Sequence, residues 1–225
     1  MTFFQQLQQQ TRDEQQYLLD SPLIGRALAG AMTLDEYRAF LIQAYHHVRH
    51  TTPLLMAVGS RISHEQEWLR EAVAEYIEEE LGHQEWVLND IAACGLDKEK
   101  VRNSQPDMAC ELMISYAWDT VQRVNPLGFF GMVHVLEGTS IRVADQAADA
   151  IQHSLQLPDR AFSYLRSHGA LDQQHVQFFA SLMNRIDQPA DQQQIVHCAR
   201  RFYLLYGNIF RTLSTDNIAQ LQQAA

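Results

Sequence analysis

The sequence predicts an all-α protein built as a bundle of about seven to eight long helices. Apolar residues recur every three or four positions over long stretches, which places them on one face of a helix. One such stripe is Leu34, Tyr37, Leu41, Ala44, Tyr45 and Val48, and another is Phe178, Phe179, Leu182, Met183 and Ile186. Residue types that cap or begin helices stand at the ends of these stretches. Convincing alternation of apolar and polar residues, the mark of a β-strand, is absent from the sequence.

Helices are expected over residues 2–19, 23–30, 34–60, 64–94, 107–123, 126–154, 159–187 and 190–213. Proline fits the first turn of a helix because no N–H is needed there. A proline stands at the start of four segments: Pro22 at 23–30, Pro126 at 126–154, Pro158 at 159–187 and Pro189 at 190–213. The third segment opens with the capping-box spacing Thr33 to Glu36, and the fourth with Ser63 to Gln66. Gly95 follows the fourth as a C-cap would. The segments 2–19 and 107–123 fill the remaining intervals.

The chain has 225 residues, of which 46% are hydrophobic and 20% charged. This composition is typical of a globular protein and excludes collagen-like and intrinsically disordered chains. Helices of nearly thirty residues exceed the soluble average and suggest long antiparallel helices in a bundle. Because no internal repeat or linker is visible, residues 1–225 are expected to form one domain.

Asp and Glu outnumber Lys and Arg by 27 to 17, which gives a formal net charge of −10. Such a chain has no general attraction for nucleic acid or anionic lipid, so neither is an expected partner. The three cysteines, which are far apart in the sequence, exclude a disulfide scaffold and a thiolate zinc site. No signal segment or long apolar stretch is visible, so a soluble cytoplasmic protein is expected. Apolar helix faces leave a homodimer possible.

His168, Asp172 and His175 form the first group of residues with metal-binding chemistry. On an α-helix, spacings of four and three place them at about 0°, 40° and 340° around the axis. Two imidazoles and a carboxylate on one face can share one or two metal ions. The alternative is an exposed polar stripe, for which the neighbouring glutamines are suited.

Glu80 and His83 form the second group, with the Glu-x-x-His spacing that helical bundles use to direct a carboxylate and an imidazole inward. Glu79 competes for the same role, because it also lies on the His83 face. The aromatic Trp86 near that face favours burial. The alternative is an acidic, solvated helix face, which is the interpretation we adopt for the flanking Glu85.

Glu137 lies in the most apolar helical segment of the chain, three residues after His134. A carboxylate in such a segment is costly to bury unless it is paired or binds a metal. Its alternatives are a helix rotated toward water, or an ion pair with Arg142 or Arg123. Metal ligation is favoured, because the two other groups supply partners.

Together these groups offer three carboxylates and three imidazoles: Glu80, His83, Glu137, His168, Asp172 and His175. Such ligands without a thiolate suit iron, or manganese, in an oxygen-handling site better than structural zinc. Three carboxylates can neutralise much of the charge of two divalent ions, so a site with two irons is preferred and a mononuclear site is the conservative version.

This ligand set resembles that of the heme-oxygenase-like diiron oxidases and oxygenases. In that family a Glu and a His on one core helix and a Glu on a later one precede His-x-x-x-Asp-x-x-His, here His168, Asp172 and His175. The resemblance spans roughly residues 10 to 210. It implies a heme-oxygenase-like helical bundle that binds two irons, uses O2 and oxidises a small organic substrate.

Sister families of the same superfamily match less well. Bacterial heme oxygenases carry a proximal His after a Thr in the first helix, and no His follows Thr11 there. Their Gly pair is replaced by Ile141 and Arg142. Thiaminase-II-like proteins use a Cys near Glu137, and none is present. The runner-up function is therefore a metal-free ligand-binding protein of the TenA-like, pyrroloquinoline-quinone-synthase-like or tetrapyrrole-related kind, and a third is a scaffold protein.

Two further patterns are left unassigned. His46 and His50 are one helical turn apart and could reach a metal or line a channel, but most such clusters are surface or hydrogen-bonded core histidines. Tyr203, Tyr206 and Phe210 form a stripe for which core packing is the default and a cavity wall the alternative.

Overall fold

The computed structural model describes residues 1–170 and 172–222, with side chains described for 1–167 and 176–222. The α-helices are α1 (Phe3–Gln10), α2 (Arg12–Leu19), α3 (Pro22–Leu28), α4 (Leu34–Val48), α5 (Thr51–Arg61), α6 (Glu67–Glu80), α7 (His83–Ala93), α8 (Lys98–Arg102), α9 (Met108–Asp119), α10 (Phe129–Leu155), α11 (Ser163–Ala170), α12 (Asp172–Arg185), α13 (Pro189–Arg211) and α14 (Ile218–Leu221). Short 310 turns cover His64–Gln66, Pro126–Gly128 and Asp159–Ala161, and a π turn Thr120–Val124 extends α9.

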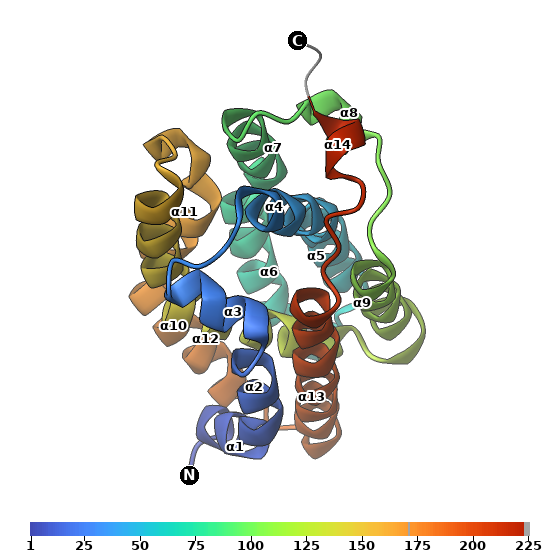
Figure 1. Cartoon of the computed structure of the whole chain (residues 1–225). Coiled ribbons are helices and arrows are strands. Elements are labelled where there is room, and N and C mark those ends of the chain that lie inside the picture. Colours follow the sequence, from blue (N-terminus) through green and yellow to red (C-terminus); the bar gives the residue numbers. More distant parts are fainter. Residues whose placement is uncertain (171, 223–225) are drawn as a thin grey trace.

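The predicted all-α class is confirmed. Within the described ranges the only β-type pairing is one isolated bridge between Leu96 and Gln222. Figure 1 shows the helices gathered into a bundle, with α1 and α14 at opposite ends of the view. None of the helices in the described part of the chain combines the length and the apolar content needed to cross a bilayer.

Several of the predicted long helices are wrong in length, because the chain breaks each of them into two. Residues 2–19 form α1 and α2, which meet at Thr11, whose hydroxyl donates to the Leu7 carbonyl at 2.8 Å. Residues 34–60 form α4 and α5, and Pro53 lies in the first turn of α5, where its missing N–H costs nothing. The predicted helix over 64–94 breaks at Gly82, which has φ +92° and separates α6 from α7.

The predicted segment 159–187 corresponds to a 310 turn followed by α11 and α12, with Leu171 between them outside the described residues. The length prediction is confirmed for α10, with 27 residues, and α13, with 23. These two helices pack closely: a Cβ built on Gly131 would lie 2.6 Å from the Ala199 backbone nitrogen and 2.8 Å from the Ile195 carbonyl oxygen. Only a glycine at position 131 permits that approach.

The predicted helix signals have mixed outcomes. Thr33 and Glu36 form the predicted capping box at the start of α4, and Pro22 and Pro189 occupy the first turns of α3 and α13. The capping box predicted at Ser63 is wrong: its side chain makes no cap hydrogen bond, and the amide of Gln66 donates instead to Asp191 Oδ2 at 2.9 Å.

The apolar interior consists of two clusters that α10 joins. One gathers buried side chains of α5, α6, α9, α12, α13 and the first turns of α10. The other gathers those of α3, α4, α7, α11 and the later turns of α10, including Ala144, Ala147 and Ile151. Glu137 lies on α10 between the two clusters. All three cysteines are buried and free, as the sequence analysis expects.

Candidate metal centre

Glu80 and His83 lie on either side of the break between α6 and α7. Glu80 is the last residue of α6 and His83 the first of α7, so the two are brought together by the turn at Gly82. The Nδ1 atom of His83 lies 3.0 Å from Oε2 of Glu80. The His83 side chain is buried, whereas Glu80 is 22% exposed. A carboxylate contact at one ring nitrogen is common for metal-binding histidines.

Glu137 is half-buried on α10, one turn after the fully apolar stretch that begins the helix. Tyr76 of α6, which is 3% exposed, lies near enough to feel its charge. Burial raises the pKa of the Tyr76 hydroxyl, and the negative charge of Glu137 is the next cause. Glu79 and Glu80 raise this pKa further. The phenol therefore stays protonated at neutral pH. The causes of its raised pKa indicate that carboxylates of both α6 and α10 lie near its hydroxyl.

Glu80 and Glu137 line one cavity, where the non-atom space, open solvent included, amounts to about 640 Å³. The remaining lining residues are mostly apolar or carry a neutral polar group: His47, Val48, Thr51, Leu55, Tyr76, Phe129, Met132, Val133, Leu136, Ser140, Tyr164 and Tyr206. We call this space the carboxylate cavity. Two acidic side chains from different helices thus meet at an otherwise apolar space, which is costly unless a cation or a proton compensates them.

The structure also bears on the alternatives for each carboxylate. Glu79 is exposed and does not line the carboxylate cavity, whereas Glu80 does. Arg123, one of the two arginines predicted as a partner of Glu137, forms an ion pair with Asp119, with Nε 2.5 Å from Oδ1. Glu85 is paired with Arg102 at 2.7 Å on the surface, in agreement with its interpretation as a solvated residue.

The third predicted group falls outside the described side chains. His168 belongs to α11, and Asp172 and His175 belong to α12, but the structure describes none of their side chains. Among the side chains that it does describe, no three carboxylate, imidazole or thiolate groups are close enough to hold a metal ion. Glu80, His83 and Glu137 do not form a metal site by themselves, so a site would need further ligands from the third group; the carboxylate and imidazole donors that they offer suit iron or manganese.

His47 is a cavity residue that the sequence analysis overlooked. It is buried, lines the carboxylate cavity, and its ring packs edge-on against Tyr206 at a centroid distance of 5.8 Å. The two histidines considered in the sequence analysis, His46 and His50, face elsewhere. His46 Nε2 lies 3.0 Å from Ser104 Oγ, and His50 Nδ1 accepts a hydrogen bond from the Trp118 indole at 3.2 Å. Helical periodicity gave no signal that separates His47 from its neighbour His46.

His134 faces a different space from Glu80. It lines an open cleft between α1, α2, α10 and α12 whose rim includes Arg12 and Arg142, and Glu137 also borders this cleft. Its Nε2 lies 3.5 Å from Thr11 Oγ1. Burial lowers the pKa of His134 to about 4, so the ring is neutral at physiological pH.

The comparison with known families agrees with the ligand types found here. A family model described as iron-containing redox enzyme matches residues 38–207. The chain belongs to this family. The matched range includes all six predicted ligands. No protein with a curated description matches the chain significantly.

Solved structures show the same fold. A domain of unknown function with a heme oxygenase-like fold from Shewanella denitrificans has a TM-score of 0.85 at 24% identity, covering 97% of this chain and 94% of that one. A TenA homologue from Pseudomonas syringae has 0.80 at 13% identity, covering 94% and 91%. Heme oxygenase from Leptospira interrogans has 0.75 at 16% identity, covering 95% and 100%. The predicted heme oxygenase-like fold is thereby confirmed.

Proposed function

We propose that this protein is a non-heme iron oxidase or oxygenase that uses O2 to oxidise a small organic substrate inside the helical bundle. The observation that carries the proposal is the meeting of Glu80 and Glu137, from α6 and α10, at one largely apolar cavity. Membership in the iron-containing redox enzyme family supports it.

The proposed ligands are Glu80, His83, Glu137, His168, Asp172 and His175, and they would hold two iron ions, with manganese as the alternative metal. Bound ferrous iron supplies electrons for the reduction of O2. The carboxylates would compensate the charge of the metal, and the imidazole of His83 would bind it while the contact with Glu80 orients the ring.

The other residues of the carboxylate cavity limit the access of water and define the shape of the site. Phe129, Met132 and Val133 of α10 are buried and present apolar surface to the cavity, which limits the access of water. Tyr76, protonated beside Glu137, is a positioning residue for that carboxylate. The free buried cysteines suit a reducing compartment, so we place the protein in the cytoplasm, with O2 and a small molecule rather than nucleic acid or membrane as its partners.

The test is iron retention by isosteric variants. Wild type and the variants Glu137→Gln and His83→Gln are loaded with ferrous iron without oxygen, desalted and assayed for iron per chain. We expect both variants to lose at least one of two retained irons, because a ligating charge or imidazole is removed without a large change in volume. Glu78→Gln, at an exposed position one helical turn or less from the site, is the matched control and should retain iron like wild type.

A metal-free ligand-binding function is the second candidate, and the TenA homologue of similar fold is the observation that favours it. It predicts that wild type and both variants retain equally little iron. That result would overturn the proposed function while leaving the fold unchanged.

A further inference from the structure

Two arginines line the open cleft between α1, α2, α10 and α12: Arg12 of α2 and Arg142 of α10. We call this space the arginine cleft. Both side chains are exposed, and neither forms an ion pair within the described part of the chain. The arginines that do form ion pairs there are Arg26, Arg38, Arg70, Arg102, Arg123, Arg166 and Arg200. In a chain with a net charge of −10, two uncompensated guanidinium groups thus line one space.

The charge of Arg142 acts on groups inside the arginine cleft. Gln15 lines the cleft, and its Nε2 donates to the Tyr203 hydroxyl at 3.1 Å. Burial raises the pKa of Tyr203 to about 12, whereas this hydrogen bond and the positive charge of Arg142 lower it. Arg142 therefore lies close enough to attract an anionic group bound in the cleft beside Gln15.

Aromatic rings from three helices form the inner wall of the cleft. Phe4 of α1 and Phe179 of α12 contact edge to face at a centroid distance of 6.0 Å. The neutral ring of His134 lies nearly parallel to that of Phe179, at a centroid distance of 6.1 Å. Such a wall favours a planar ligand, which can stack on one ring and contact the edge of another.

Amide side chains complete the lining. Gln5, Gln8 and Gln9 of α1 border the cleft together with Gln15. Because an amide group both donates and accepts, these side chains can satisfy the polar edge of a bound molecule. The acid among the described lining residues is Glu137, which is half-buried, whereas the two arginines are exposed. An anionic group is therefore favoured at the rim and an uncharged group in the interior.

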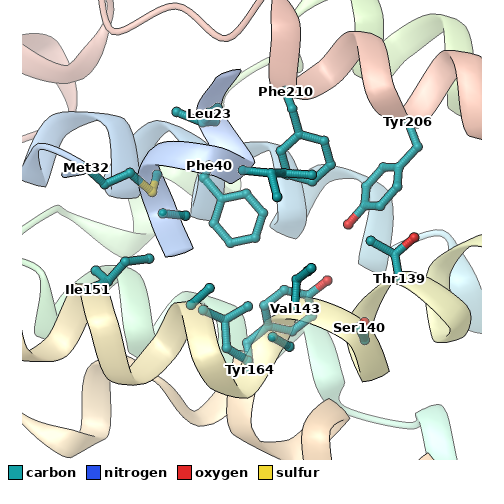
Figure 2. Close-up of a pocket in the computed structure, with 15 residues that line it drawn as sticks. Leu23, Met32, Phe40, Thr139, Ser140, Val143, Ile151, Tyr164, Tyr206 and Phe210 are labelled. Atoms are coloured by element: carbon teal, nitrogen blue, oxygen red, sulfur yellow. The ribbon is translucent and has the colours of Figure 1, made fainter. Parts of the chain in front are cut away.

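A separate pocket farther along α10 has a different lining. Figure 2 shows Phe40 and Phe210 across this pocket from Val143. None of its described lining residues carries a charge. The two sides of α10 thus differ in chemistry, since Arg142 belongs to the arginine cleft alone.

We propose that the arginine cleft binds a planar aromatic molecule that carries a carboxylate or a phosphate. The anionic group lies at Arg12 and Arg142, where guanidinium groups can form charge-assisted hydrogen bonds with it, and the ring lies against Phe4 and Phe179. Glu137 borders both this cleft and the carboxylate cavity, so the bound ring lies next to the proposed metal site. The inference goes beyond the proposed function and does not depend on bound iron.

The test measures dissociation constants by calorimetry with the metal-free chain, so that no probe can bind to iron. The probes are 2-naphthoate, 2-naphthyl phosphate and the uncharged 2-naphthamide. We expect at least one anion to bind about tenfold more tightly than the amide, and the tighter anion identifies the acidic group. Decahydro-2-naphthoate, which keeps the charge without an aromatic ring, should bind more weakly than 2-naphthoate. Failure of both anions to bind, or affinities equal to that of the amide, would overturn the proposal.

Substitutions separate the contribution of the charge from that of the ring. Arg12→Gln and Arg142→Gln should each weaken binding of the anion about tenfold and leave binding of 2-naphthamide unchanged, because only a charge is removed. Phe4→Leu should weaken both probes by the same factor. Arg160→Gln is the matched control, at an exposed arginine that does not line the cleft. If Arg12→Gln and Arg142→Gln bind the anion as tightly as Arg160→Gln does, the assignment is wrong. Thermal unfolding verifies that each variant folds.

Iron retention, measured separately, distinguishes this inference from the proposed function. Charge-dependent binding by a chain that retains no iron would overturn the iron-dependent function and leave the cleft assigned. Retained iron without binding of either anion would overturn the cleft assignment and leave the iron-dependent function in place.

Discussion

His46 is buried near the end of α4, where desolvation lowers its pKa to about 4 and the charges of Arg49 and His50 contribute further. The unfolded chain binds a proton at this residue near pH 6.5, before the folded protein does. The stability contributed by neutral His46 is therefore fully present above that pH and is lost as the pH falls toward about 4.

Replacing His46 by Gln removes this titration and keeps a donor for Ser104. We expect the free energy of unfolding to fall less steeply between about pH 6.5 and 4, by at most about 3 kcal/mol in total. Urea unfolding over this range measures it. The control is His64→Gln, at an exposed position on the turn before α6. An unchanged pH dependence in His46→Gln would show that this imidazole is protonated in the folded state as easily as in the unfolded one.

Also at the residue scale, the sequence predicted the types of donor residue at the candidate site. It did not predict all the residues that line the cavity. Glu80, His83 and Glu137 were selected by spacing and by the cost of a carboxylate in an apolar helix, and Glu80 and Glu137 line one cavity. His47 was missed, because a histidine beside a stripe of apolar residues is not distinguished by periodicity from its neighbour His46. Which of the two faces the cavity depends on the rotation of α4, which packing against α7 and α9 determines.

At the scale of elements, α10 and α13 approach each other closely at Gly131. Gly131→Ala would push a methyl group against the backbone of α13, and overpacking of this kind costs about 3 kcal/mol. Gly25→Ala is the control, because nothing lies within 4 Å of its added Cβ and alanine favours a helix. Chemical denaturation should show Gly131→Ala destabilised and Gly25→Ala equal to or more stable than wild type. A neutral Gly131→Ala would contradict the described approach of the two helices.

Gly82 allows the turn that joins α6 to α7. Its φ of +92° is disfavoured for residues with a Cβ, so Gly82→Ala should lower the free energy of unfolding by about 1–2 kcal/mol. Because the same turn brings Glu80 to His83, the variant should also weaken iron retention. Gly82→Asn, which tolerates positive φ better, should lose less of both. If Gly82→Ala matches wild type in stability, the left-handed turn is not required.

The helix breaks explain where sequence-based prediction of the elements failed. Helical periodicity continues across residues 34–60 and 64–94, so it indicates one long helix where the structure has two. Pro53 and Gly82 were the available signals, since proline belongs in a first turn and glycine permits positive φ. The break at Thr11 had no such signal in its residue type.

At the scale of the whole molecule, the helical periodicity and the absence of strand patterns predicted the all-α class, and the family resemblance carried by the ligand set implied the heme oxygenase-like fold. The two apolar clusters could not be predicted, because they depend on how α10 divides its length between two sets of partners. The same division places Glu137 at the carboxylate cavity, between the two clusters.

The most direct test of the central claim is to titrate the metal-free protein with ferrous iron in the absence of oxygen and then to add O2. After desalting, the account predicts close to two retained irons per chain, O2 consumption that depends on the bound iron, and an absorbance change that free ferrous iron under the same conditions does not give. Failure to retain iron, or O2 uptake no faster than that of free ferrous iron, would contradict the iron-dependent function.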